Sequence, residues 1–150
     1  SSKDVHNNFD WQLYNNMAQR LSRYEQVRVI APRAGEVIVP IHGGTFNMLA
    51  FHGDGVRSTM PGVPWGGVNR RVGELGSQFR HLNIDYFALG HFHTANIVET
   101  SAGRVFMNGS VKGPDEYSIK RMGGGRHAQQ LLLTFHPTRG YTDVSFLDLS

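Results

Sequence analysis

The chain has 150 residues, of which 39% are apolar and 11% aromatic, so a wholly disordered chain is excluded. It contains no cysteine, which excludes disulfides, thiolate zinc sites and thiol nucleophiles; any metal must bind through His, Asp, Glu, Asn or water. Fifteen Lys and Arg against 12 Asp and Glu give a net charge of +3, a mild basic bias compatible with phosphate-bearing partners. The basic residues form no run, so a basic nucleic-acid-binding arm is also excluded.

Length and apolar pattern predict one domain without a membrane-spanning segment. A chain of this size is about one domain long, and no linker or repeat divides it. No apolar run approaches the roughly 20 residues that cross a bilayer, and Ser1–His6 lacks the apolar region of a signal peptide. We therefore expect residues 1–150 to form a single unit in the cytoplasm, with no membrane partner.

The first third of the chain is expected to form one helix and three strands. Apolar residues recur at helical spacing over residues 9–24, which predicts an amphipathic helix. The apolar stretch 27–30 predicts a short strand. Two more strands are expected at 36–41 and 46–52, joined as a hairpin by His42-Gly43-Gly44-Thr45.

The middle of the chain alternates between a loop, a helix and strands. Residues 58–67 contain two prolines and three glycines and predict a loop. One apolar face then predicts a second helix over 68–82. The apolar run 86–89 predicts a buried strand, and 97–100 with 104–107 predict a hairpin.

The last third is expected to contain an irregular segment and two closing strands. Residues 109–125 are polar and irregular, with one helical turn expected near Tyr117. Strands are expected at 131–135 and 142–147. The whole pattern predicts a mixed α/β fold with roughly seven or eight strands and two helices.

Two histidine motifs follow predicted strands directly. Gly90-His91-Phe92-His93 follows one, and an extended segment would place its two imidazoles on the same side, about 6–7 Å apart, a spacing that suits two neighbouring metal ions. The second motif, His52-Gly53-Asp54, ends another strand. Because ligands gather at the carboxyl ends of strands in α/β sheets, we expect His52, His91 and His93 to meet at one edge.

These two motifs, together with Met107-Asn108-Gly109-Ser110, resemble the C-terminal half of a calcineurin-like metallophosphoesterase. The resemblance covers most of the chain and implies an α/β fold, a β-sandwich flanked by helices. It also implies two divalent metal ions, Mn, Fe or Zn. His52 and His91 would bind one ion and His93 the other, and the Asn108 turn would lie beside the site.

The family's N-terminal signatures have no clear match in this chain. They are an Asp-x-His after the first strand, a Gly-Asp and a Gly-Asn-His, and they supply the bridging Asp, the remaining ligands and the catalytic His. Asp4-Val5-His6 has the letters of the first signature, but no apolar strand precedes it. The resemblance therefore implies the C-terminal part of a longer domain, which lacks the catalytic His and needs the N-terminal half as its partner.

Four residues are candidates to support the metal ligands or to contact substrate: Asp54, Arg57, Asn108 and Lys112. Asp54 either orients an imidazole or shapes a turn, and both interpretations stay open. Arg57 and Lys112, and also Arg121, are candidates to contact substrate phosphate, with solvated surface charge as the alternative. Asn108 either lines the site or is an ordinary turn residue.

The function implied by the resemblance is metal-dependent hydrolysis of a phosphomonoester or phosphodiester, by attack of a metal-bound hydroxide on phosphorus. Because carboxylate bridges are missing, we expect this chain alone to bind metal weakly and to hydrolyse little bis-p-nitrophenyl phosphate. One alternative is a DNA repair-type nuclease of the same family, with nucleic acid as substrate. The other is a non-catalytic nucleic-acid-binding or scaffold module whose histidines are structural.

Overall fold

The computed structural model describes residues 9–32, 35–56, 62–113 and 127–150. The chain divides into two compact units, Ser1–Val37 and Ile38–Ser150, which are described separately. The expectation that residues 1–150 form one domain therefore stays a prediction. No helix in the described ranges is long and apolar enough to cross a membrane.

The first unit contains α1, Phe9–Leu21, which ends three residues before the predicted boundary. After α1 the chain turns, with the Tyr24 N–H donating to the Leu21 carbonyl and the Val27 N–H to the Tyr24 carbonyl, both at 3.0 Å. The strand predicted at 27–30 is wrong: this segment has no strand assignment. Its β-branched residues favour extended structure, but a strand needs a neighbour to pair with, and the ladders of this fold do not include 27–30.

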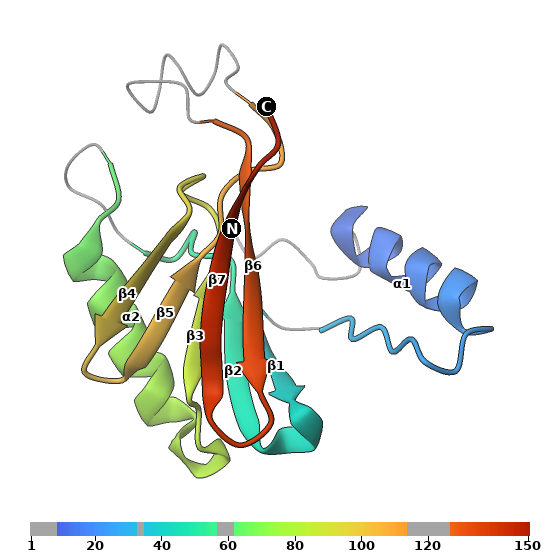
Figure 1. The fold of residues 1–150 in the computed structure, drawn as a ribbon, viewed down its shortest axis with the longest axis horizontal. Coiled ribbons are helices and arrows are strands. Elements are labelled where there is room, and N and C mark those ends of the chain that lie inside the picture. Colours follow the sequence, from blue (N-terminus) through green and yellow to red (C-terminus); the bar gives the residue numbers. More distant parts are fainter. Residues whose placement is uncertain (1–8, 33–34, 57–61, 114–126) are drawn as a thin grey trace. The chain divides into compact units, whose positions relative to one another are not determined.

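The second unit is built on a five-stranded sheet with the order β1-β2-β3-β5-β4, whose first strand begins two residues before the unit boundary (Figure 1). The strands are β1 (Glu36–Ile41), β2 (Phe46–Phe51), β3 (Tyr86–Leu89), β4 (Asn96–Thr100) and β5 (Gly103–Met107). β2, β3 and β5 run parallel, whereas β4 is antiparallel to β5. β1 is an edge strand, where Pro40 is tolerated because no inner ladder needs its missing N–H.

The two predicted hairpins and the predicted second helix can be compared with the structure. The short 3-10 helix η2 (His42–Gly44) joins β1 to β2, and β4 and β5 form the other hairpin, as expected. The second helix, α2, runs over Trp65–Gln78, so it begins and ends earlier than predicted, and η3 (Arg80–Leu82) follows it. Residues 58–61 of the predicted loop lie outside the described ranges, and α2 already begins at Trp65 within its last part.

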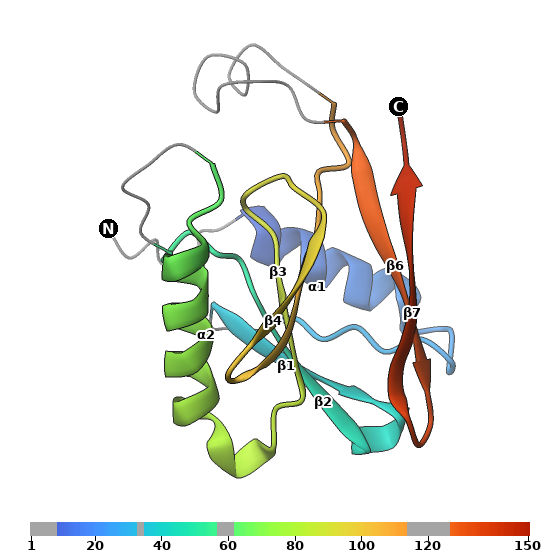
Figure 2. The same cartoon turned by 60° about the vertical axis from the view of Figure 1, so that its left-hand side comes forward.

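Helix α2 covers one face of the sheet (Figure 2). Its side chains Val68, Val72 and Leu75 are buried together with Leu49 and Phe87 of the sheet. The residues of β3 alternate in burial, whereas the last three residues of β5 are all buried. Burial of this apolar face stabilises the unit through the hydrophobic effect.

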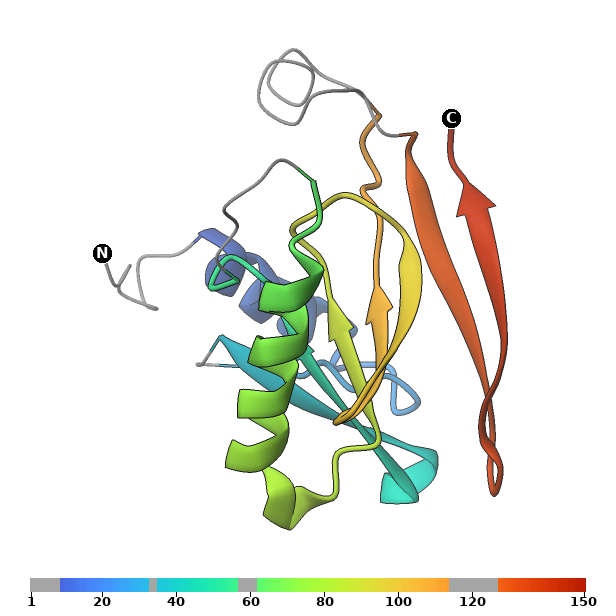
Figure 3. The ribbon, with the colours of Figure 1, turned by 90° about the vertical axis from the view of Figure 1, so that its left-hand side faces the viewer.

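A two-stranded hairpin packs on the other face of the sheet (Figure 3). It consists of β6 (Gln129–His136) and β7 (Gly140–Asp148), each longer than predicted. Phe135 lies against Tyr86, with ring centroids 5.2 Å apart, and Tyr141 lies against Phe106 at 5.0 Å. The Tyr141 N–H donates to the Tyr86 hydroxyl at 2.9 Å. The unit is thus a layered α/β structure, as expected, although the predicted turn near Tyr117 lies outside the described residues.

Candidate metal centre

The three parallel strands end at one edge of the sheet. Phe51 is paired with Leu89 in the register, and Leu89 with Met107, so the loops that follow begin side by side. The N–H of Asn108, in the loop after β5, donates to the carbonyl of Leu89 at the end of β3, at 2.8 Å. The sequence prediction that both histidine motifs reach the same carboxyl edge is therefore confirmed.

His52 and His91 face each other across this edge. The distance from His52 Nε2 to His91 Nδ1 is 3.2 Å, and the rings meet edge to face with centroids 5.0 Å apart. Both residues are exposed to solvent. Without a metal, this contact is a hydrogen bond, in which one nitrogen carries the proton and the other accepts it. This hydrogen bond therefore requires that one of the two nitrogens is unprotonated.

The Gly90–His93 segment is not extended, so the prediction from extended geometry is wrong. His91 and His93 have φ angles of 69° and 51°, in the left-handed region that non-glycine residues rarely adopt. The Phe92 N–H donates to the Gly90 carbonyl at 2.8 Å, which closes a γ-turn around His91. The burial of Phe92 between two exposed histidines is equally compatible with an extended segment, so the turn is defined by the backbone angles and this hydrogen bond and not by the burial pattern.

The surroundings of His91 favour its neutral form. Partial burial of the ring lowers its pKa from the usual 6.5, and the neighbouring His52 and His93 lower it further, while the Asp54 carboxylate raises it. A neutral imidazole is the form that binds a metal ion. His93 and Asp54 are thus near enough to influence His91 electrostatically.

The spacing of the facing nitrogens is compatible with a shared metal ion. Two nitrogens bound to one tetrahedral ion at about 2.0–2.1 Å lie about 3.3 Å apart. The observed 3.2 Å between His52 Nε2 and His91 Nδ1 fits this value. Among the described residues, however, no three His, Asp or Glu side chains form a group that could hold an ion, so His93 does not complete the pair. Within the described ranges, the ligand-like spacing is therefore limited to these two nitrogens.

The other predicted contact residues occupy different surroundings. Asp54 is exposed in a turn in which the Val56 N–H donates to the Gly53 carbonyl at 3.0 Å, and both interpretations of its role stay open. Lys112 is exposed, with its N–H donating to Ser110 Oγ at 3.1 Å. Arg57 and Arg121 lie outside the described residues.

Asn108 is engaged with the hairpin. Its Oδ1 accepts from the Leu131 N–H at 2.9 Å and its Nδ2 donates to Gln130 Oε1 at 2.7 Å. Gln130 in turn donates to the Gly109 carbonyl at 2.8 Å. The side chain therefore fastens the edge of the sheet to β6, a role that sequence reasoning missed because Gln130 lies 22 positions away and carries no motif.

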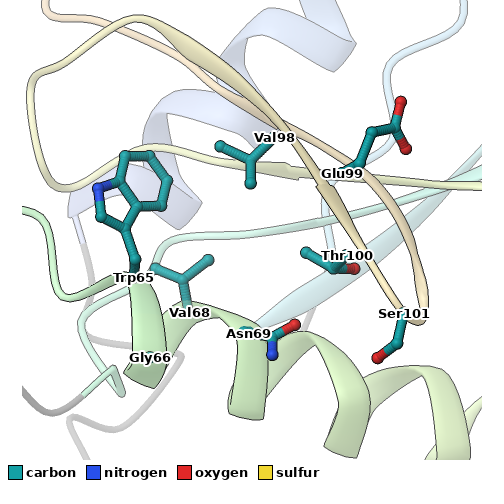
Figure 4. A pocket seen from close by; sticks show the side chains of 8 residues that line it. All are labelled: Trp65, Gly66, Val68, Asn69, Val98, Glu99, Thr100 and Ser101. Carbon is teal, nitrogen blue, oxygen red and sulfur yellow. The ribbon is translucent and has the colours of Figure 1, made fainter.

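A cavity of about 480 Å³ lies elsewhere, between α2 and the edge strand β4 (Figure 4). Its lining is Trp65, Gly66, Val68, Asn69, Val98, Glu99, Thr100 and Ser101. The lining contains no histidine and none of the residues predicted for the site. We therefore assign the candidate chemistry to the carboxyl edge, where the titratable side chains meet, and not to this cavity.

No family model and no curated protein matches the chain. Among solved structures, it is similar to a double mutant of Vps29 from Entamoeba histolytica, at 16% identity over 96% of this chain and 79% of the other, with a TM-score of 0.55. A single mutant of the same protein matches at 16% identity over 83% of this chain, with a TM-score of 0.52.

The chain spans only 66% of the length of that single-mutant structure. A further match is a conserved uncharacterized protein from Streptococcus pneumoniae described as a predicted phosphoesterase, at 12% identity over 93% and 83% of the two chains, with a TM-score of 0.48. Likenesses at such identities concern the fold alone. At that level the two Vps29 matches show that the chain shares their fold, which agrees with the fold that the histidine motifs implied.

Proposed function

We propose that the chain carries part of the metal centre of a phosphoesterase, which hydrolyses a phosphomonoester or phosphodiester. One observation carries this proposal: His52 Nε2 and His91 Nδ1 face each other at 3.2 Å, at the carboxyl edge of two parallel strands. This edge is where α/β folds collect their ligands. The fold and the two histidine motifs support the same assignment.

In this proposal His52 and His91 hold one ion, and His93 contributes to a second. Bound divalent cations would withdraw charge from the phosphoryl oxygens and acidify a water molecule. An imidazole that binds a metal ion carries no charge of its own, so such ligands leave the charge of the cations available to the phosphate. Imidazole ligands suit Mn, Fe and Zn alike, and we propose two ions of this class.

The remaining groups of the centre are expected from another part of the domain. Two like-charged ions need carboxylates between them, and Asp54 is the one acidic side chain that the described residues place near enough to influence His91. We therefore propose that the bridging carboxylate and the catalytic His belong to the N-terminal half of the domain. A cytoplasmic location likewise remains a prediction.

The proposal is tested with the protein expressed from its complete gene. Hydrolysis of p-nitrophenyl phosphate and bis-p-nitrophenyl phosphate is measured with Mn²⁺ for the wild type, His52→Ala and His91→Ala. Loss of a ligand is expected to lower kcat/KM by about 100-fold or more, since even the groups supporting a ligand contribute about 10–100-fold. His81→Ala is the control, because His81 is exposed on η3, before β3 begins.

Three outcomes contradict the phosphoesterase proposal: hydrolysis that persists in EDTA, wild-type rates in both site variants, and no hydrolysis by the wild type. A parallel assay with single-stranded and duplex DNA separates the substrate classes. Cleavage of DNA with weak hydrolysis of the two small esters would identify the nuclease alternative. Binding of DNA without any hydrolysis would favour the non-catalytic module.

A further inference from the structure

Gly53 lies where the loop after β2 packs against the loop that carries His91. It follows His52 directly and has a φ of +99°, a conformation that L side chains rarely adopt. A Cβ built on Gly53 would lie 3.2 Å from the Cβ of His91 and 3.3 Å from Cδ1 of Leu89. Carbon atoms in favourable contact are about 3.5–4.0 Å apart, so any larger residue forces a displacement here.

The two neighbours of Gly53 differ in their freedom to move. Leu89 is 3% exposed, belongs to the core and sits on β3 between two strands. His91 is exposed and lies on the γ-turn that follows this strand. A side chain at position 53 would therefore displace His91 in preference to Leu89, and it would widen the gap between His52 and His91.

We propose that Gly53 is a positioning residue that sets the separation of His52 Nε2 and His91 Nδ1. Because Gly53 has no side chain, the loop after β2 packs directly on the loop after β3. His52 Nε2 and His91 Nδ1 then lie at the distance that two ligands of one ion require. The link to metal binding rests on the proposed function. The separation itself is a property of the metal-free protein, so it can be measured whether or not the proposed function holds.

The glycine could instead serve only the turn, in which its carbonyl accepts from the Val56 N–H. Two comparisons separate these roles. Gly55→Ala is the matched control, because Gly55 lies in the same loop without a left-handed φ, and a Cβ added there would meet no atom within 4 Å. Gly53→Asn is the second variant, because Asn accepts left-handed backbone more readily than Ala but still has a Cβ.

The first measurement is made on the full-length protein in EDTA. Imidazole ¹⁵N and ¹H NMR signals of His52 and His91 report the contact between the rings. We expect Gly53→Ala and Gly53→Asn to lose the signature of this hydrogen bond, and Gly55→Ala to keep it. Signals unchanged in Gly53→Ala would overturn the proposal. Restoration by Asn would also overturn it, because backbone strain and not the contact would then be responsible.

The second measurement uses Co²⁺ as the probe, followed by its visible absorption. We expect Gly53→Ala to weaken Co²⁺ binding by about tenfold or more and to alter the absorption bands, a size comparable with loss of a supporting group. Gly55→Ala should bind as the wild type does, and an equal loss in this control would overturn the proposal. A wild type that binds no Co²⁺ contradicts the proposed function, while the NMR comparison still decides the role of Gly53.

Discussion

The helix-covered face of the sheet and its carboxyl edge are adjacent but differ in side-chain burial and in backbone conformation. On the face, Leu49 and Phe87 are fully buried in regular strands. At the edge, Gly53, His91 and His93 all have positive φ, and the two histidines are exposed. The contrast indicates that the regular core holds an irregular edge in place, which is where strained residues of functional sites are usually found.

Phe92 connects the two regions. Its side chain is 8% exposed and belongs to the core under α2, whereas its ring also lies 5.1 Å from that of His91. A single buried residue thus anchors the turn that presents His91 and His93. The core therefore contributes to the geometry of the edge as well as to stability.

The largest expected effect comes from the core. Phe87→Ala removes a fully buried ring between α2 and the sheet, and it should lower the free energy of unfolding by about 3–5 kcal/mol. Urea unfolding followed by circular dichroism measures this change. Phe146→Ala is the control, because Phe146 is 48% exposed and should cost much less. Equal losses in the two variants would mean that the helix-covered face is not the stabilising core.

A smaller loss of stability is expected where the edge meets the hairpin. Asn108→Ala leaves the Leu131 N–H and Gln130 Oε1 without this partner, which should cost about 1–3 kcal/mol. Asn69→Ala, at an exposed position of α2, should cost little. The same denaturation experiment tests both variants. If Asn108→Ala were neutral, its hydrogen bonds to β6 could not be what fastens the hairpin to the edge.

The smallest effect is a pH dependence at the edge. In EDTA, His91 should titrate below 6.5 by NMR, because burial and the nearby His52 lower its pKa. The unfolded chain then binds more protons than the folded one between the two pKa values, so stability should rise with pH across this window and level off above about 6.5. His52→Ala should move the pKa of His91 upward but not remove the shift, since burial is the larger cause. A pKa of His91 above 6.5 in the wild type would contradict this picture.

The strands that the sequence predicted best are those with local signals. The run Tyr86–Leu89 is apolar throughout and is bounded by turn residues, and its observed limits match the prediction. The segment 27–30 is also rich in β-branched residues but forms no strand, because pairing with a neighbour is not encoded locally. The local pattern therefore predicted where extended segments lie, whereas the pairing of these segments into a sheet depends on the three-dimensional fold.

The candidate site also combines features that the sequence predicted with features that depend on tertiary packing. The position of His52 and His91 at one edge followed from strand ends in parallel strands. The γ-turn at His91 could not be derived from spacing, because the exposed–buried–exposed pattern of residues 91–93 fits an extended segment equally well. The link from Asn108 to Gln130 depends on tertiary packing and had no sequence signal at all.

Whether His52 and His91 bind one and the same ion is decided by a double-mutant cycle of Zn²⁺ affinity. Calorimetric titrations would compare the full-length wild type, His52→Ala, His91→Ala and the double variant. We expect the double variant to lose little more affinity than either single variant, because removing one imidazole already disrupts the shared site. Independent, additive losses, or wild-type affinity in both single variants, would contradict a shared ion.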